Sequence, residues 1–231
     1  MVDTNSPATH LGNHTRTRPT NASTPTFGEC LKSALRRLPT DRGERVEEYQ
    51  VFPDWEAKNR RQESIEIPLM VKAMKLPTGG RILEVGCGRG VGLVGIGRLL
   101  APKLLVGLDI ERDFLTDARS ALDENSIDAQ LFWGDVRQMP FPDASFDLVI
   151  DFGTCFHIAH PHRALGEIAR VLDIGGLFVH ETMIAQLLSH PLRSLGRAMP
   201  AEWFPQLQLR RWRGLWTCRQ KTDEMIGCAT E

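Results

Sequence analysis

The segment from residue 82 to residue 90, Ile-Leu-Glu-Val-Gly-Cys-Gly-Arg-Gly, constrains the fold more than any other part of the chain. An apolar run leads directly into a turn in which glycine alternates with other residues, and the apolar segment 91–100 follows. A strand, a glycine-rich turn and a helix in this order are typical of open parallel sheets, where the turn lets the backbone approach a ligand closely.

The spacing of the glycines argues against a dinucleotide site. The dinucleotide fingerprint has glycine in its first, third and sixth positions. Counted from Gly86, the sixth position is Val91. A nicotinamide-dependent oxidoreductase therefore stays as a less favoured alternative.

From residue 81 onward, apolar strand-like runs alternate with helical patterns. Strands are predicted at 81–85, 104–108, 129–133, 146–151 and 177–180, and helices at 89–100, 113–124 and 161–172. This alternation predicts an α/β fold, a doubly wound and mostly parallel sheet with helices on both faces. Two further strands, 206–211 and 215–220, are predicted to form a closing antiparallel hairpin.

The composition divides the chain into four parts. Residues 1–26 contain 15 Thr, Ser, Asn or Pro and are expected to be a disordered tail that is dispensable for folding. Residues 27–78 are predicted to be a helical lead-in or lid, with a helix within 63–74 that starts near Pro68. The regular core occupies 79–221, and residues 222–231 are a short C-terminal tail.

Bulk properties exclude several classes of protein. A formal net charge of -1 provides no overall field for nucleic acid, and no apolar run has the roughly 18 residues expected of a membrane span. The five cysteines are scattered without a C-x-x-C pair, which predicts neither a metal site nor a disulfide framework. With no apolar signal-peptide core at the N-terminus, we expect a cytoplasmic protein.

Two acidic residues follow predicted strands. Asp109 ends the strand at 104–108, 21 residues after Gly88, where a carboxylate can accept hydrogen bonds from both hydroxyls of a ribose. A helix cap or a solvated loop acid is the alternative for this residue. The second acid is Asp135, in the triplet Gly134-Asp135-Val136 that follows the strand at 129–133.

The glycine turn, with Glu84 two residues before Gly86, has the pattern E-x-G-x-G-x-G. It resembles motif I of the class I S-adenosylmethionine (SAM)-dependent methyltransferases. The segments 134–147 and 156–176 are similar to the same family, except that Asp173 and Ile174 replace the usual Lys and Pro of one turn. The resemblance spans about 79–181 and looks closest to the small-molecule group of ubiquinone, sterol and natural-product enzymes.

This resemblance implies a Rossmann-like, mixed seven-stranded sheet whose last strand is antiparallel, and SAM as the cofactor. The residues that it implies for SAM binding are Glu84, Gly86, Cys87, Gly88, Asp109, Ile110, Asp135 and Val136. In the family, the acid after the third strand accepts from the adenine amino group, and the next residue supplies a backbone donor. The expected activity is methyl transfer to a small, lipophilic acceptor, and a non-catalytic binding protein of the same fold is the alternative.

The acceptor side is less well defined by the sequence. His157 is a candidate general base, although the family commonly has a histidine there for structural reasons. The segment 151–154 lacks the N/D-P-P-aromatic tetrad of enzymes that methylate DNA amines or protein glutamine, so these substrates are not expected. No pattern indicates the oligomeric state.

Two features outside the regular βα units remain. The first is a set of apolar residues that either form the acceptor pocket or cap the sheet as ordinary core. They are Tyr49, Phe52, Trp55, Met183 and Trp203. Between 186 and 221 there are seven Lys or Arg and one Glu, which form either a solvated strand face or a surface that attracts an anionic substrate.

Overall fold

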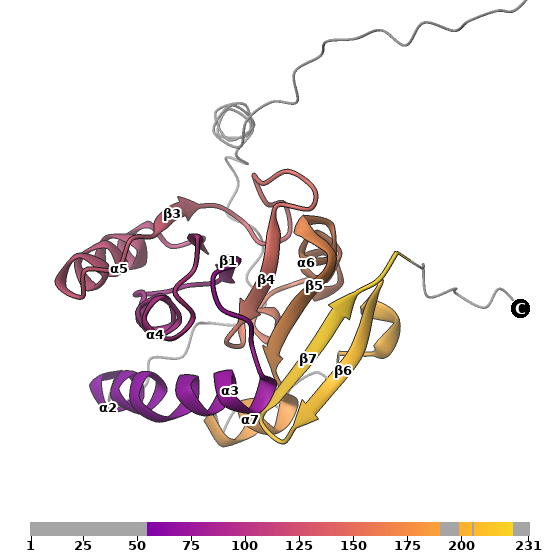
Figure 1. Ribbon diagram of the computed structural model, residues 1–231, viewed down its shortest axis with the longest axis horizontal. Helices are drawn as coiled ribbons and strands as arrows, with labels where there is room; N and C mark the ends of the chain where they lie inside the picture. Colours follow the sequence, from indigo (N-terminus) through magenta and orange to yellow (C-terminus); the bar gives the residue numbers. More distant parts are fainter. Residues whose placement is uncertain (1–54, 190–198, 205, 224–231) are drawn as a thin grey trace, which may run out of the picture.

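A single sheet organises the chain in the computed structural model, which describes residues 55–189, 199–204 and 206–223. Its seven strands are β1 (Arg81–Val85), β2 (Leu104–Asp109), β3 (Gln130–Trp133), β4 (Phe146–Asp151), β5 (Leu172–Glu181), β6 (Leu207–Arg213) and β7 (Trp216–Lys221). They lie in the order β3-β2-β1-β4-β5-β7-β6 (Figure 1). The first five strands are parallel and β7 is antiparallel to both neighbours, so the predicted mixed seven-stranded sheet is confirmed.

Helices cover both faces of this sheet (Figure 1). They are α2 (Trp55–Arg61), α3 (Ile67–Met74), α4 (Val91–Leu100), α5 (Arg112–Glu124), α6 (Pro161–Val171) and α7 (Met183–Ser189), with shorter helical turns η2 (Gln62–Glu66), η3 (Thr154–Phe156) and η4 (Ala201–Trp203). Buried residues of α3, α4 and α5 pack in one apolar cluster, and those of α6 pack in a second.

The alternation of side chains along β1 separates these two cores. Ile82 packs with the α4 cluster, whereas Leu83 and Val85 pack with the α6 cluster. Because both faces are covered, the strand reads as an almost continuous apolar run rather than as an alternating pattern. This is why the short run at 81–85 could be recognised as a strand.

Some predicted boundaries were wrong. Helix α3 begins at Ile67, one residue before the predicted start at Pro68, but a helix from Trp55 and the π-helical turn η2 precede it. Strand β5 begins at Leu172 instead of 177, because Leu172 still pairs with Phe146 before the register shifts to Leu148 and Leu177. Gly175, at φ +83°, takes the left-handed conformation within this irregular part of the strand.

The hairpin turn also differs from the prediction. Arg213 pairs with Trp216, so the connection is Gly214-Leu215 and not 212–214. The predicted tail at 1–26, most of the lead-in and residues 224–231 lie outside the described residues, and the proposed domain boundaries remain predictions.

Arg170 on α6 fixes the segment that leads from β3 to β4. Its guanidinium donates to the carbonyl oxygens of Phe141 and Met139 at 2.7 and 3.2 Å, and it pairs with Glu167 at 2.7 Å. Glu167 in turn accepts from the backbone N–H of Met139 at 2.7 Å. One arginine thus satisfies backbone groups of a loop that has no regular hydrogen bonding of its own.

We predict that Arg170→Ala lowers the free energy of unfolding by about 2–3 kcal/mol, because it leaves partly buried carbonyl groups and Glu167 without their donors. Urea unfolding followed by circular dichroism measures this loss. Arg163→Ala, an exposed arginine on the same helix, should change stability by less than about 0.5 kcal/mol. Equal effects of the two substitutions would contradict this role for Arg170.

Candidate functional site

The glycine turn after β1 has one face packed and one face open. A Cβ on Gly86 would lie 1.8 Å from Oγ1 of Thr154, which donates to the Val85 carbonyl at 3.2 Å. At Gly88, with φ +49°, nothing lies within 4 Å of a Cβ. Gly86 therefore lets η3 pack against the turn, while the backbone around Gly88 is accessible to a ligand.

Glu84 lies beneath this turn with its side chain almost completely buried, and Oε2 has no hydrogen-bond partner within the described part of the chain. A Cβ on Gly92 would lie 2.1 Å from Oε1, so only glycine lets the carboxyl sit against the first turn of α4. Burial, and then the charges of Asp109 and Asp151, raise the pKa of Glu84 well above its usual value. An orphaned buried carboxyl oxygen of this kind calls for a further hydrogen-bond donor.

Asp109 joins the end of β2 to the glycine turn. Its Oδ2 accepts from the backbone N–H of Gly88 and its Oδ1 from that of Glu111, both at 2.8 Å. These two bonds orient the Asp109 carboxylate. The predicted residues Glu84, Gly86, Gly88 and Asp109 thus meet at the carboxyl ends of β1 and β2.

Asp135 is held by an arginine that sequence reasoning missed. The Arg137 guanidinium contacts both carboxylate oxygens at 2.7–3.0 Å, and the Arg137 backbone N–H donates to Oδ1 at 2.8 Å. Burial acts to raise the pKa of Asp135, but the hydrogen bonds from Arg137 outweigh it and lower the pKa. Asp135 is therefore charged and fixed in orientation, and the two-residue spacing was the signal for this pair.

The other predicted cofactor residues divide between surface and core. Ile110 is 39% exposed, and its carbonyl accepts from Nε1 of Trp133 at 2.9 Å. Val136 and Cys87 are buried in the two apolar clusters. Burial raises the pKa of the Cys87 thiol, which makes it a packing residue and no nucleophile. Only the backbone of Val136 could serve the predicted role.

His157 belongs to a polar chain over the carboxyl ends of β4 and β5. Its Nε2 lies 3.0 Å from Oε1 of Gln186, and Nε2 of Gln186 donates to Oε2 of Glu181. Since the Gln186 nitrogen faces the carboxyl, its oxygen faces the histidine. A Cβ on Gly153, at φ +105°, would lie 2.4 Å from Nε2 of Gln186, so this packing requires glycine.

Glu181 is the carboxyl group of this chain of polar groups, and its pKa is shifted. Burial, and then the charges of Asp151 and Glu66, raise its pKa to about 7, against the opposing effect of Lys58. Sequence reasoning missed both Glu181 and Gln186. Glu181 could have been found, because it ends a parallel strand at the edge where ligand sites of such sheets lie.

The predicted pocket residues are only partly placed. Trp203 is half-buried against the α6-side core, with its ring 5.9 Å from that of His162. Met183 is 41% exposed at the start of α7, and Trp55 begins α2. Tyr49 and Phe52 lie outside the described residues. Core packing accounts for the position of Trp203, so its role toward an acceptor remains a prediction.

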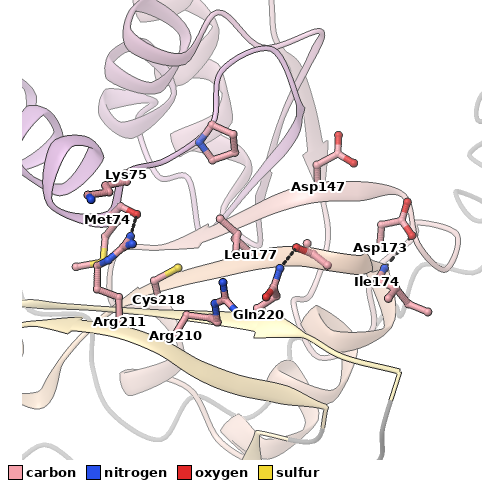
Figure 2. Close-up of a pocket in the computed structure, with 13 residues that line it drawn as sticks. Met74, Lys75, Asp147, Asp173, Ile174, Leu177, Arg210, Arg211, Cys218 and Gln220 are labelled. Carbon is pink, nitrogen blue, oxygen red and sulfur yellow. Dashed lines mark hydrogen bonds between the residues drawn. The ribbon is translucent and has the colours of Figure 1, made fainter.

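A cavity of about 540 Å³ lies at the opposite, amino edge of the sheet (Figure 2). Its lining includes Met74, Asp147, Arg211 and Gln220. Asp147 lies four positions before Asp151 along β4, which corresponds to a distance of about 13 Å along the strand. This cavity is therefore distinct from the site. The described residues contain no cluster of His, Cys, Asp or Glu that could hold a metal, and no helix among them is long and apolar enough to cross a membrane.

Comparison with known proteins adds family information to this geometry. Residues 83–180 match the family model described as a methyltransferase domain. The fatty-acid O-methyltransferase of Mycolicibacterium smegmatis is 32% identical over 129 residues, which cover 56% of this chain and 46% of the relative. The phosphatidylethanolamine N-methyltransferase of Cereibacter sphaeroides is 34% identical over 100 residues, covering 42% and 48%. The chain spans about half the length of these curated relatives.

Solved structures show the same fold. A SAM-dependent methyltransferase structure from Methanococcus maripaludis, described as putative by its authors, superposes with a TM-score of 0.58 at 17% identity, covering 78% of this chain and 99% of that one. A protein from Pyrococcus horikoshii superposes with a TM-score of 0.55 at 20% identity, covering 74% and 93%.

We predict that Glu181→Gln makes stability less dependent on pH. In the folded protein the Glu181 carboxyl keeps its proton up to about pH 7, whereas the unfolded chain loses it near 4.5. The contribution of Glu181 to stability should therefore fall as the pH rises from 4.5 to 7, whereas the contribution of His180, whose pKa burial lowers to about 4, rises with pH in both proteins. Urea unfolding at pH 5 and pH 8 should show that the variant loses about 2 kcal/mol less than the wild-type protein between these values.

Glu202→Gln, an exposed glutamate on η4, is the matched control and should follow the wild-type curve. Comparing each protein with itself at two pH values removes any fixed cost of the substitution. A Glu181→Gln curve parallel to that of the wild-type protein would contradict the burial of this carboxyl.

Proposed function

We propose that this chain is a class I SAM-dependent methyltransferase that transfers a methyl group from SAM to a small, lipophilic acceptor. The match of residues 83–180 to the methyltransferase family model supports this proposal, and so does the shared fold. The observation that carries the proposal is the bond between the Gly88 N–H and the Asp109 carboxylate. It places an open stretch of backbone beside a fixed acceptor, which is the combination that a ribose needs.

The residues at the carboxyl ends of β1, β2 and β3 fit such a cofactor. The Asp109 carboxylate can accept from the ribose hydroxyls, and the Asp135 carboxylate, oriented by Arg137, can accept from the adenine amino group. The half-exposed side chain of Ile110 can cover one face of the adenine ring. The orphaned oxygen of Glu84 can accept from the ammonium group of the methionine part, directly or through water.

The charge of the site also suits a cation. Three acids lie at or near the carboxyl ends of the adjacent strands β1, β2 and β4, namely Glu84, Asp109 and Asp151. Burial is the main cause of the raised pKa of Glu84, and repulsion from the other two acids raises it further. A ligand that carries ammonium and sulfonium charges relieves this repulsion, whereas an anionic ligand increases it. The acidic site therefore favours SAM over the nicotinamide dinucleotides, which carry an anionic pyrophosphate.

When bound, SAM supplies a methyl group that is already activated for displacement. The task left for the chain is to hold an acceptor in line with that group and to keep water away. The polar chain of His157, Gln186 and Glu181 borders the place where an acceptor would enter, at the ends of β4 and β5. We include His157 as the candidate group for proton removal when the acceptor is a hydroxyl or an amine.

The acceptor class is supported by two kinds of observation. The relatives are named for methylation of fatty acids and of phosphatidylethanolamine, both of which have long apolar chains. Apolar side chains such as Met183 lie on the segment after β5, beside the proposed acceptor entrance. A cytoplasmic location, with neither nucleic acid nor a metal as partner, belongs to the same proposal.

We predict that Asp109→Ala raises the Kd for SAM about 10- to 150-fold, corresponding to about 1.5–3 kcal/mol for lost hydrogen bonds to a charged group. Asp109→Asn, which keeps one acceptor oxygen, should have an intermediate effect. Isothermal titration calorimetry with SAM measures both values.

Asp128→Ala, an exposed acid after α5, is the control and should leave the affinity unchanged. Circular dichroism shows whether each variant is folded. A folded Asp109→Ala variant that binds SAM like the wild-type protein would remove Asp109 from the site.

Turnover is tested with radiolabelled SAM and a panel of medium- and long-chain fatty acids, phosphatidylethanolamine and a sterol. We expect label in an organic-extractable product with at least one member of the panel. Tight SAM binding with no labelled product from lipids, small metabolites, nucleic acid or protein would favour the non-catalytic binding protein. Binding of NADH in place of SAM would favour the oxidoreductase.

A further inference from the structure

The hairpin of β6 and β7 meets α7 at the carboxyl edge of the sheet (Figure 1). The backbone N–H of Thr182 donates to the Leu215 carbonyl, and its Oγ1 donates to the Gly214 carbonyl, both at 2.8 Å. Two hydrogen bonds therefore fasten the start of α7 to the hairpin turn. Arg213 pairs with Trp216 and Trp216 with Glu181, which places the end of β6 level with the proposed acceptor entrance.

Large apolar side chains are exposed around this junction. Met183 and Ile184 on α7 are 41% and 46% exposed, and Trp212 near the end of β6 is 55% exposed. Arg213 follows Trp212 and is also exposed. Consecutive side chains of a strand point to opposite faces, so Trp212 and Arg213 lie on the two faces of the hairpin beside its turn. We refer to these four residues, Met183, Ile184, Trp212 and Arg213, as the hairpin–α7 surface. Exposed apolar residues beside a site mark a surface that contacts something other than water.

Positive charge lies close to this surface on β6, which carries Arg210, Arg211 and Arg213. Arg210 and Arg213 on β6 are both exposed, and within the described residues neither forms an ion pair with a carboxylate. These cations are therefore available to an anionic partner.

We propose that the hairpin–α7 surface docks this protein on an anionic lipid bilayer. The inference rests on the proposed function, because docking there brings the acceptor entrance to a membrane that holds lipophilic acceptors. Tryptophan is favoured at the boundary between head groups and acyl chains, where one part of its ring system is apolar and its N–H remains hydrated. Arginines beside it bind the lipid phosphates.

A second copy of the chain is a less suitable occupant of this surface. The free edge of β6 could pair with another strand, but Arg210, Arg211 and Arg213 would then meet the same charges on the partner. Like charges opposite one another destabilise strand pairs, and charged side chains on edge strands commonly prevent such pairing. A bilayer with anionic head groups instead attracts Arg213, which is exposed at the end of β6.

Sedimentation of the full chain with vesicles tests the proposal, with no SAM or acceptor present. We expect binding to vesicles of phosphatidylcholine mixed with phosphatidylglycerol, weak binding to phosphatidylcholine alone, and a loss of binding as salt is raised. Arg213→Ser should lower partitioning about fivefold, which corresponds to ~1 kcal/mol for an arginine at an anionic surface. Trp212→Ser should lower it roughly tenfold through the loss of buried apolar area.

Ile174→Ser and Arg163→Ser are the matched controls. Ile174 is 64% exposed near the amino edge of the sheet and Arg163 is exposed on α6, so neither substitution should change partitioning. Unchanged SAM affinity shows that each variant is folded. Equal partitioning onto both vesicle types, or variants of the hairpin–α7 surface that bind like the controls, would overturn the proposal. Self-association that Trp212→Ser abolishes would overturn it in favour of a dimer.

The two proposals can fail separately. Vesicle binding without methyl transfer to any acceptor would leave docking in place and remove the proposed function. Methyl transfer to a dissolved medium-chain fatty acid, with no binding to anionic vesicles, would leave the function and remove docking. If both hold, Trp212→Ser should slow transfer to vesicle-borne acceptors while leaving transfer to the dissolved acid unchanged.

Discussion

The hydrogen bonds of the Asp109 carboxylate are the constraint on which the site depends. One oxygen accepts from Gly88 in the turn after β1, and the other accepts from Glu111 at the entrance to α5. Two loops that are distant in sequence are thereby held at one edge of the sheet. The open backbone at Gly88 and the exposed side chain of Ile110 then lie on either side of a charged acceptor.

Burying several carboxyl groups close together at this edge of the sheet lowers the stability of the fold, and a bound ligand can offset this loss. Glu84 is buried with one oxygen unsatisfied, and both Asp151 and Glu181 have a raised pKa because of burial. Such arrangements concentrate at functional sites, where a ligand supplies the missing donor or charge. The backbone N–H groups of Thr154 and Cys155 stabilise Asp151, while Glu84 has no equivalent in the described part of the chain. A cationic ligand would offset this cost most effectively at Glu84.

Most of the fold could be predicted from the sequence, because both faces of the sheet are buried and its strands read as apolar runs. Strand β4 was predicted with the observed boundaries, and β1 likewise. The start of β5 was missed because Asp173, Gly175 and Gly176 look like a turn, and only the pairing of Leu172 with Phe146 shows that the strand has begun. At the site, motifs located Asp109 and Asp135. They could not locate Gln186, whose importance comes from contacts with His157 and Glu181, 29 and 5 residues away.

The central claim is that SAM binds across the glycine turn, Asp109 and Asp135. A crystal structure of the complex with the demethylated cofactor tests it most directly. The ribose hydroxyls should lie within hydrogen-bond distance of the Asp109 carboxylate, and the adenine ring should lie beside Ile110 with its amino group directed at Asp135. A ligand found instead in the cavity at the amino edge (Figure 2), or no bound ligand at saturating concentration, would contradict the account.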